Sequence, residues 1–184
     1  MNIYLDATTL IALGEVGELD LLTSLDGRLR ILPAVTEEVT TERAEHNLRR
    51  FMNRDTVSVS GFLDSLFRET REAKEEAKRV LAEDGMDGDV AIVTMLIQLG
   101  NKGIDSALVS DDRRLRTVAE GLGARVTGTI GVGVRAVAED ELTEQEAKTL
   151  VRRLDSHGLH MTGELRETTD ELIEEAARKS EGDD

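Results

Sequence analysis

The chain has 184 residues, of which 39% are apolar and 2% aromatic, so we expect one domain with an aliphatic core. It contains no cysteine, which excludes disulfides and thiolate metal sites. No stretch has the unbroken apolar length of a membrane span, and no basic region precedes a hydrophobic run at the start. These features predict a cytoplasmic protein that does not enter membranes.

The net charge is −15, from 38 acids and 23 bases, and the bases are 18 Arg and 5 Lys. This sign is opposite to that of most nucleic-acid-binding surfaces, because phosphates attract basic side chains. A solvated acidic surface adapted to high salt is one explanation, since salt screens the self-repulsion of such a surface. A protein that does not contact nucleic acid is the other. The scarcity of Lys favours the high-salt explanation.

The hydrophobic pattern of the first half alternates between strands and helices. Predicted strands cover residues 2–6, 28–32 and 57–60, and predicted helices cover 8–13, 18–25, 34–50 and 62–81. We expect Gly14 and Gly17 to interrupt the first helix. For 57–60 the pattern indicates either a brief strand at a sheet edge or an extended link.

The second half begins with a helix at 89–99 that is apolar nearly all round and should be buried on most sides. Strands are predicted at 104–110 and 124–127, and helices at 115–122, 130–138, 143–154 and 165–177. Thr143 and Glu146 match a capping box. Strand, helix and strand with short links predict a parallel sheet. We divide the chain into an α/β body at 1–138 and a C-terminal helical extension at 139–184.

Acidic residues stand at the boundaries of these predicted elements. Asp6 ends the first strand, Glu37 and Glu38 lie just inside a predicted helix start, Asp89 opens the buried helix, and Asp111 and Asp112 end a strand. Acids so placed can converge at one edge of a parallel sheet. Carboxylates without His or Cys suit Mg²⁺ or Mn²⁺, and such a site suits metal-assisted hydrolysis of a phosphodiester.

Each of these residues also has a plain structural interpretation. Asp6, Asp89 and one of the Asp111–Asp112 pair could cap helices or favour the positive end of a helix dipole. Thr8 and Ser110 could be ordinary caps. Arg113, Arg114 and Arg116 could contact phosphate or form a solvated helix face.

Four segments, in this order, resemble the PIN-domain ribonucleases, the family of the VapC-type toxins. They are Leu5-Asp6-Ala7-Thr8, Pro33-Ala34-Val35-Thr36-Glu37-Glu38-Val39, Gly88-Asp89-Val90-Ala91-Ile92 and Val109-Ser110-Asp111-Asp112-Arg113-Arg114-Leu115. The later segment 126–132 and the helical tail at 143–175 resemble a subgroup with a C-terminal extension. The resemblance implies a three-layer α/β/α domain with a central parallel sheet.

Carried over to this chain, the resemblance implies that Asp6, Glu38, Asp89 and Asp112 are the catalytic, metal-binding acids. Asp111 would be an auxiliary ligand, and Thr8 and Ser110 would be supporting hydroxyls. Glu38 is preferred because it precedes Val39, and Asp112 because Leu115 follows three residues later; Glu37 and Asp111 are the alternatives.

The implied activity is a Mg²⁺- or Mn²⁺-dependent endoribonuclease acting on RNA. The resemblance also implies a homodimer, and a cognate antitoxin that blocks the acidic groove of a toxin. Two other functions remain open: a housekeeping RNA-processing nuclease, and a non-catalytic module that keeps the fold for partner binding.

Overall fold

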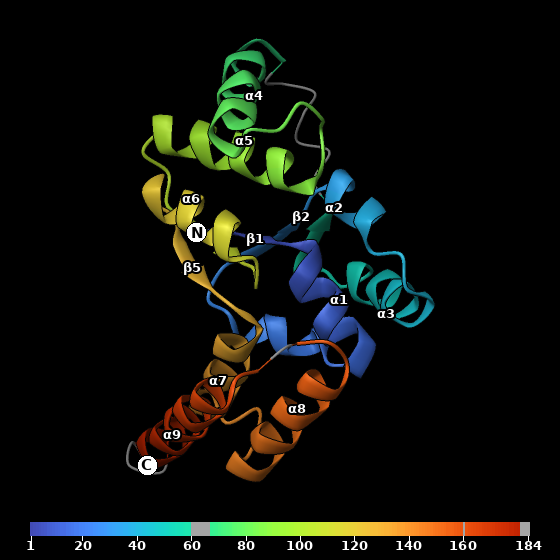
Figure 1. The fold of residues 1–184 in the computed structure, drawn as a ribbon, viewed down its shortest axis with the longest axis vertical. Coiled ribbons are helices and arrows are strands. Elements are labelled where there is room, and N and C mark those ends of the chain that lie inside the picture. Colours follow the sequence, from blue (N-terminus) through green and yellow to red (C-terminus); the bar gives the residue numbers. More distant parts are fainter. Residues whose placement is uncertain (60–66, 160, 181–184) are drawn as a thin grey trace.

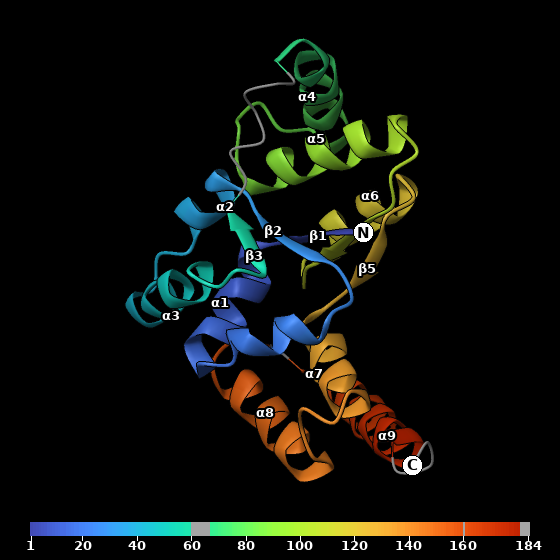
Figure 2. The same cartoon turned by 180° about the vertical axis from the view of Figure 1, so that it is seen from behind.

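At the centre of the computed structural model, which describes residues 1–59, 67–159 and 161–180, lies one sheet of five parallel strands. The strands are β1 (Asn2–Leu5), β2 (Arg28–Ile31), β3 (Val57–Val59), β4 (Ser106–Val109) and β5 (Arg125–Thr127), and they lie in the order β3-β2-β1-β4-β5. The predicted parallel sheet and the position of residues 57–59 at its edge are confirmed. Seen from behind, β3 lies beside β2 (Figure 2).

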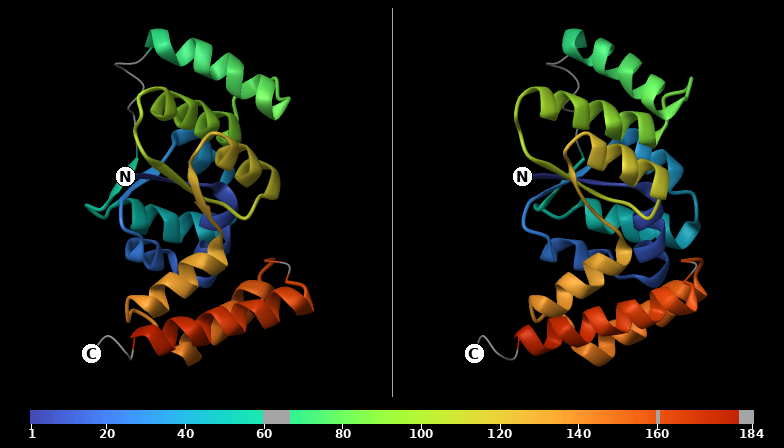
Figure 3. Two further views of the ribbon diagram at one scale, coloured as in Figure 1. Left: turned by 90° about the vertical axis from the view of Figure 1, so that its left-hand side faces the viewer. Right: turned by 60° about the vertical axis from the view of Figure 1, so that its left-hand side comes forward.

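Helices cover both faces of this sheet (Figures 1 and 3). One face carries α4 (Phe67–Leu81), α5 (Gly88–Asn101) and α6 (Arg113–Gly121). The other carries α1 (Ala7–Val16), the 3₁₀-helix η1 (Leu19–Ser24), α3 (Glu42–Met52) and α7 (Thr129–Ala138). The predicted three-layer α/β/α fold is therefore confirmed.

The most deeply buried helix is α5, as its continuous apolar pattern predicted. Every residue from Val90 to Leu99 is buried, because α5 lies between the sheet and α4. A helix that is apolar on all sides needs such a covering layer. The helix predicted at 62–81 is seen from Phe67 onward, and residues 62–66 of that prediction lie outside the described part of the chain.

The single helix predicted at 34–50 is wrong, because the chain forms two helices there. The first, α2 (Pro33–Glu38), ends at Val39, whose φ and ψ of −82° and 89° are not helical. Thr41 then opens α3, and its hydroxyl bonds to Glu15 of α1. Consecutive β-branched residues at 39–41 favour an extended backbone. As a result, Glu37 and Glu38 lie at the end of a helix and not just inside a helix start.

The expected interruption of the first helix at Gly14 is also wrong. α1 continues through Gly14 and ends at Gly17, which has a φ of 75° that glycine adopts easily. Gly14 instead allows α3 to approach closely, since a Cβ on Gly14 would lie 2.9 Å from the Cα of Ala44. The Nδ2 of Asn47 also donates to the Gly14 carbonyl at 2.8 Å.

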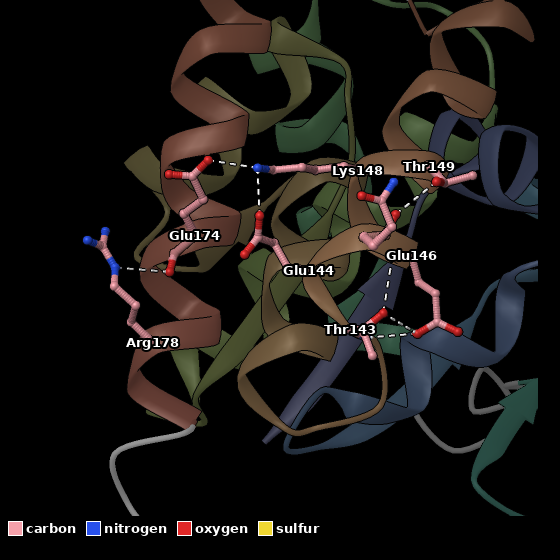
Figure 4. Close-up of polar contacts among 8 residues, drawn as sticks. Thr143, Glu144, Glu146, Lys148, Thr149, Glu174 and Arg178 are labelled. Atoms are coloured by element: carbon pink, nitrogen blue, oxygen red, sulfur yellow. Dashed lines mark hydrogen bonds and ion pairs between the residues drawn. The ribbon is translucent and has the colours of Figure 1, made fainter.

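The helices α7, α8 (Glu144–Ser156) and α9 (Gly163–Ser180) pack together, and we call them the C-terminal arm. They share a small apolar core made of Val137, Ala147, Val151, Ile173 and Ala176. The predicted capping box is present, and Lys148 bridges Glu144 at 2.8 Å and Glu174 at 2.7 Å (Figure 4). Because α7 also packs on the main core through Val132 and Ala136, the boundary at residue 138 stays a prediction.

Helix α8 also contacts the rest of the domain, through Arg153 and through two apolar side chains. Arg153 donates from Nη1 to Glu18 at 2.7 Å and from Nη2 to the carbonyl of Val16, at the end of α1. Leu150 and Leu154 lie in the main core. Among the helices of the described residues, none is long and apolar enough to cross a bilayer.

Candidate active site

Asp6 lies directly after β1 and caps α1, and only 2% of its surface is exposed. Its Oδ1 accepts a hydrogen bond from the Ala7 amide at 2.7 Å. Its Oδ2 accepts from the Thr8 hydroxyl at 2.6 Å and from the Ser110 hydroxyl at 2.7 Å. A carboxylate removed from water needs such donors, because burial without them costs several kcal/mol. The orientation of Asp6 is therefore fixed by the residues beside it.

Thr8 and Ser110 are themselves oriented by the loop that follows β4. The Thr8 hydroxyl accepts from the Asp111 amide at 3.1 Å, and the Ser110 hydroxyl accepts from the Asp112 amide at 3.0 Å. Each hydroxyl thus donates to Asp6 and accepts from a backbone amide of the loop that follows β4. Both lie in contact with Asp6, where their predicted supporting role would place them.

The neighbours Asp111 and Asp112 point their side chains to different partners. Asp112 caps α6, and its Oδ1 accepts from the Leu115 amide at 2.7 Å. Asp111 accepts from the Thr129 amide at 2.8 Å through Oδ1 and from the Thr129 hydroxyl through Oδ2. Within the described residues, Oδ2 of Asp112 accepts no hydrogen bond, whereas both Asp111 oxygens are bonded to α7.

Glu38 reaches the site from the last residue of α2, whose end lies beside the start of α5 (Figure 1). Its Oε1 accepts from the Gly88 amide at 2.6 Å. A Cβ on Gly88 would lie 2.8 Å from the Glu38 Oε2, so the carboxylate can sit here only against a glycine. Glu37 and Glu38 are both exposed, but only Glu38 is among the acids that act on Asp89.

Asp89, in the first turn of α5, brings these acids into one electrostatic cluster. Burial, together with smaller effects of repulsion from Asp6, Asp112, Asp87 and Glu38, raises the pKa of its carboxyl to about 7. We call these five residues the acid cluster. Its members come from α2, α5 and the residues that cap α1, α5 and α6. Asp111 and Glu37 do not contribute to the shift at Asp89.

Sequence reasoning missed Asp87. This residue caps α5 by accepting from the Val90 amide at 2.9 Å, and it belongs to the acid cluster through its effect on Asp89. Its place two residues before Asp89, directly before a predicted buried helix, is the signal that could have identified it.

The arginines of α6 lie beside the cluster without pairing to it. Arg114 forms an ion pair with Glu83 at 3.1 Å, Arg113 is exposed, and Arg116 is half-buried near Gly128 and Asp111. None of the ion pairs found among the described residues involves a member of the acid cluster.

The donor set fits a hard divalent cation, because it consists of carboxylates whose mutual repulsion a cation would remove. In the described residues, no three acidic, His or Cys side chains are yet arranged closely enough to ligate one ion. The carboxylates would have to turn inward to bind it. Glu38, Asp87, Asp89 and Asp112 are able to do so, since each has at least one oxygen outside its described hydrogen bonds.

The fold and this cluster define an α/β protein with an acidic site at the carboxyl edge of a parallel sheet. Comparison with known protein families matches residues 2–175 to a family described as a PIN domain. The chain therefore belongs to the PIN-domain family, whose members are generally nucleases. Comparison with curated proteins gives no match.

Proposed function

We propose that this protein is a divalent-metal-dependent endoribonuclease whose ligands are Asp6, Glu38, Asp89 and Asp112. The observation that carries the proposal is the meeting of Asp89 with four other carboxylates, at the end of α2 and the starts of α1, α5 and α6, without an ion-pair partner among the described residues. Burial makes the ionised Asp89 carboxylate costly, repulsion from the other acids adds to that cost, and a bound cation would relieve it. Mg²⁺ or Mn²⁺ is the cation that carboxylate oxygens prefer in the absence of His and Cys.

Asp6 and Asp89 would have different roles in such a site. When bound, a divalent ion lowers the pKa of a water molecule and stabilises the leaving oxygen of a phosphodiester. Asp6, held by its three hydrogen bonds, provides a ligand that does not move. Asp89 must release its proton before it can bind an ion, so metal affinity should rise as the pH passes through about 7.

Arg113 is the arginine best placed to contact an RNA phosphate. It is exposed, follows Asp112 directly and has no described ion pair, whereas Arg114 pairs with Glu83 and Arg116 lies half-buried beside Gly128. A guanidinium beside the metal ligands would hold a phosphate near the cluster and reduce its repulsion by the acidic surface.

The family resemblance supports a finer proposal, that the enzyme is the toxin of a toxin–antitoxin pair. Such a toxin would act on RNA in the cytoplasm as a homodimer, and its antitoxin would cover the acid cluster. A basic segment inserted among the carboxylates would complement their charge. We also propose that the net charge of −15 adapts the surface to high salt. The unfolding free energy of the protein should therefore increase as the KCl concentration rises to molar values.

The test is incubation of total RNA with the protein in high salt, with Mn²⁺, with Mg²⁺ and with EDTA. Asp89→Ala is the inactive variant, and Asp20→Ala, an exposed acid paired with Arg54, is the matched control. We expect discrete fragments with the wild type and the control, and none with EDTA or Asp89→Ala. Folded protein that cleaves nothing with either metal would contradict the proposal and favour a non-catalytic partner-binding module.

A further inference from the structure

We propose that Asp111 is a positioning residue, which clamps the C-terminal arm to the loop that carries Asp112 and supports Asp6. The first part of the clamp is its side chain. Both carboxylate oxygens accept hydrogen bonds from one residue, Thr129, through its amide at 2.8 Å and through its hydroxyl. Thr129 is fully buried and begins α7, the arm helix that reaches the main core.

This contact replaces a helix cap. Gly128, at the N-cap position of α7, has no side chain with which to bond the first amides of the helix. Asp111 supplies that acceptor from a different strand end, and its negative charge lies at the positive end of α7. A Cβ on Gly128 would lie 2.7 Å from Oδ1 of Asp111, so the absence of a side chain allows this approach.

The second part of the clamp is the backbone of the same residue. The Asp111 amide donates to the Thr8 hydroxyl at 3.1 Å, and that hydroxyl donates to Oδ2 of Asp6 at 2.6 Å. A continuous series of hydrogen bonds therefore runs from Thr129 through Asp111 and Thr8 to Asp6. If α7 moved away, the loop at Asp111 and Asp112 would lose its anchor, and the donors to Asp6 would lose their orientation.

Both parts give Asp111 a role that differs from that of a metal ligand. A ligand acts through its negative charge, so Asp111→Asn would weaken metal binding as strongly as Asp111→Ala. A clamp acts through its two hydrogen bonds. Asparagine can keep both, because its Oδ1 accepts from the Thr129 amide and its Nδ2 donates to the Thr129 hydroxyl, which has free lone pairs.

The experiment compares Asp111→Ala, Asp111→Asn, Thr129→Val and the double variant Asp111→Ala/Thr129→Val. Amide hydrogen exchange in EDTA measures the clamp without metal, and Mn²⁺ titration measures its effect on the site. The matched control is Asp155→Ala, which removes an acid that contacts Arg166 and the Met161 amide inside the arm.

We expect Asp111→Ala and Thr129→Val to speed exchange of the Ala7 and Asp112 amides by about tenfold or more. In the double variant these amides should exchange no faster than in Asp111→Ala. Asp111→Asn should stay close to the wild type, and Asp155→Ala should speed exchange only around 155–161. Mn²⁺ affinity should fall several-fold in Asp111→Ala and Thr129→Val but little in Asp111→Asn.

Two results would overturn the clamp. One is unchanged exchange at Ala7 and Asp112 in Thr129→Val, which leaves the backbone of α7 intact. The other is a loss of Mn²⁺ binding in Asp111→Asn that equals the loss in Asp111→Ala, which would make Asp111 a ligand. The effect on metal rests on the proposed function, but the exchange in EDTA does not. Wild-type protein that binds no Mn²⁺ would therefore refute the nuclease proposal and leave the clamp to be decided by exchange alone.

Discussion

The two sides of the acid cluster are built differently. On the strand side, Asp6 and Asp112 follow β1 and β4, and they are held by the Ser110 hydroxyl and by amides in the first turns of α1 and α6. On the helix side, Glu38, Asp87 and Asp89 come from α2 and the start of α5. There Glu38 is held by a single amide, and no hydrogen bond to the Asp89 carboxyl is found among the described residues. The strand side is preorganised by its own neighbours, whereas the helix side keeps a repulsion that only a proton or a cation relieves.

The largest effect on stability is expected when the hydrogen bonds to Asp6 on the strand side are removed. Asp6→Ala should lower the unfolding free energy by about 3 kcal/mol, because it leaves the Ala7 amide and two hydroxyls without an acceptor. Asp6→Asn should lower the unfolding free energy far less, because asparagine preserves the shape of the side chain and one acceptor oxygen. Urea denaturation in EDTA measures both. An Asp6→Ala variant as stable as the wild type would show that these hydrogen bonds do not hold the strand side together.

The helix side should respond in the opposite direction, and only above about pH 4. The pKa of Asp89 is raised from 3.8 to about 7 in the folded protein, so the unfolded chain loses this proton first; the unfolding free energy therefore falls between about pH 4 and pH 7, and the full penalty is present above pH 7. Below about pH 4 the carboxyl is protonated in both the folded and the unfolded state, and no penalty exists.

Asp89→Asn should therefore stabilise the metal-free protein above pH 7, by about 2 kcal/mol after allowance for solvent screening, and should change nothing near pH 4. Urea denaturation of both proteins across this range, in EDTA, checks the prediction. A variant less stable than the wild type at pH 8 would contradict it.

A smaller effect is expected from the contact that attaches α2 to α5. Gly88→Ala would place a methyl group 2.8 Å from the Glu38 Oε2 and push this carboxylate out of the cluster. We expect Mn²⁺ affinity to fall about tenfold while the fold persists, because alanine favours a helix more than glycine does. Gly121→Ala in α6, where a Cβ meets nothing within 4 Å, is the matched control. Equal Mn²⁺ affinity in both variants would argue against a role for Glu38.

The smallest effect concerns the arginines that neither side of the cluster uses. Arg113→Ala should weaken RNA binding several-fold, because it removes a phosphate contact next to Asp112, and should leave Mn²⁺ affinity unchanged. Arg114→Ala removes a guanidinium already paired with Glu83 and should change RNA binding less. Binding to a labelled RNA by the two variants, at equal salt, decides between a phosphate contact and a solvated face.

Local sequence patterns predicted the strand side better than the helix side. Asp6 and Asp112 each follow an apolar strand, and parallel strands necessarily bring such residues to one edge. Glu38 was assigned to a helix start, because the sequence at 34–50 does not reveal that the chain stops being helical at Val39. Asp87 lies between the helices predicted at 62–81 and 89–99, so no predicted element drew attention to it. The effect of Asp6 on Asp89 depends on how α5 docks, which is a matter of tertiary packing.

The bond between Asp111 and Thr129 could not be predicted for a similar reason. Eighteen residues and a whole helix separate the two, and each has an ordinary local interpretation as a strand-end acid and a helix-start hydroxyl. The capping box at Thr143 and Glu146, by contrast, was predicted because its partners lie within one turn. Signals carried by neighbouring residues can be found in the sequence, and contacts between distant elements need the fold.

The measurement that tests the acid cluster most directly is titration of the protein with Mn²⁺, followed by electron paramagnetic resonance, at pH 8 and at pH 6. We expect the wild type to bind Mn²⁺ more tightly at pH 8 than at pH 6, because Asp89 must lose its proton, and we expect Asp89→Asn to bind weakly at both. Wild-type protein that binds no Mn²⁺ at millimolar concentration, or Asp89→Asn protein that binds as tightly as the wild type, would contradict a metal site built around Asp89.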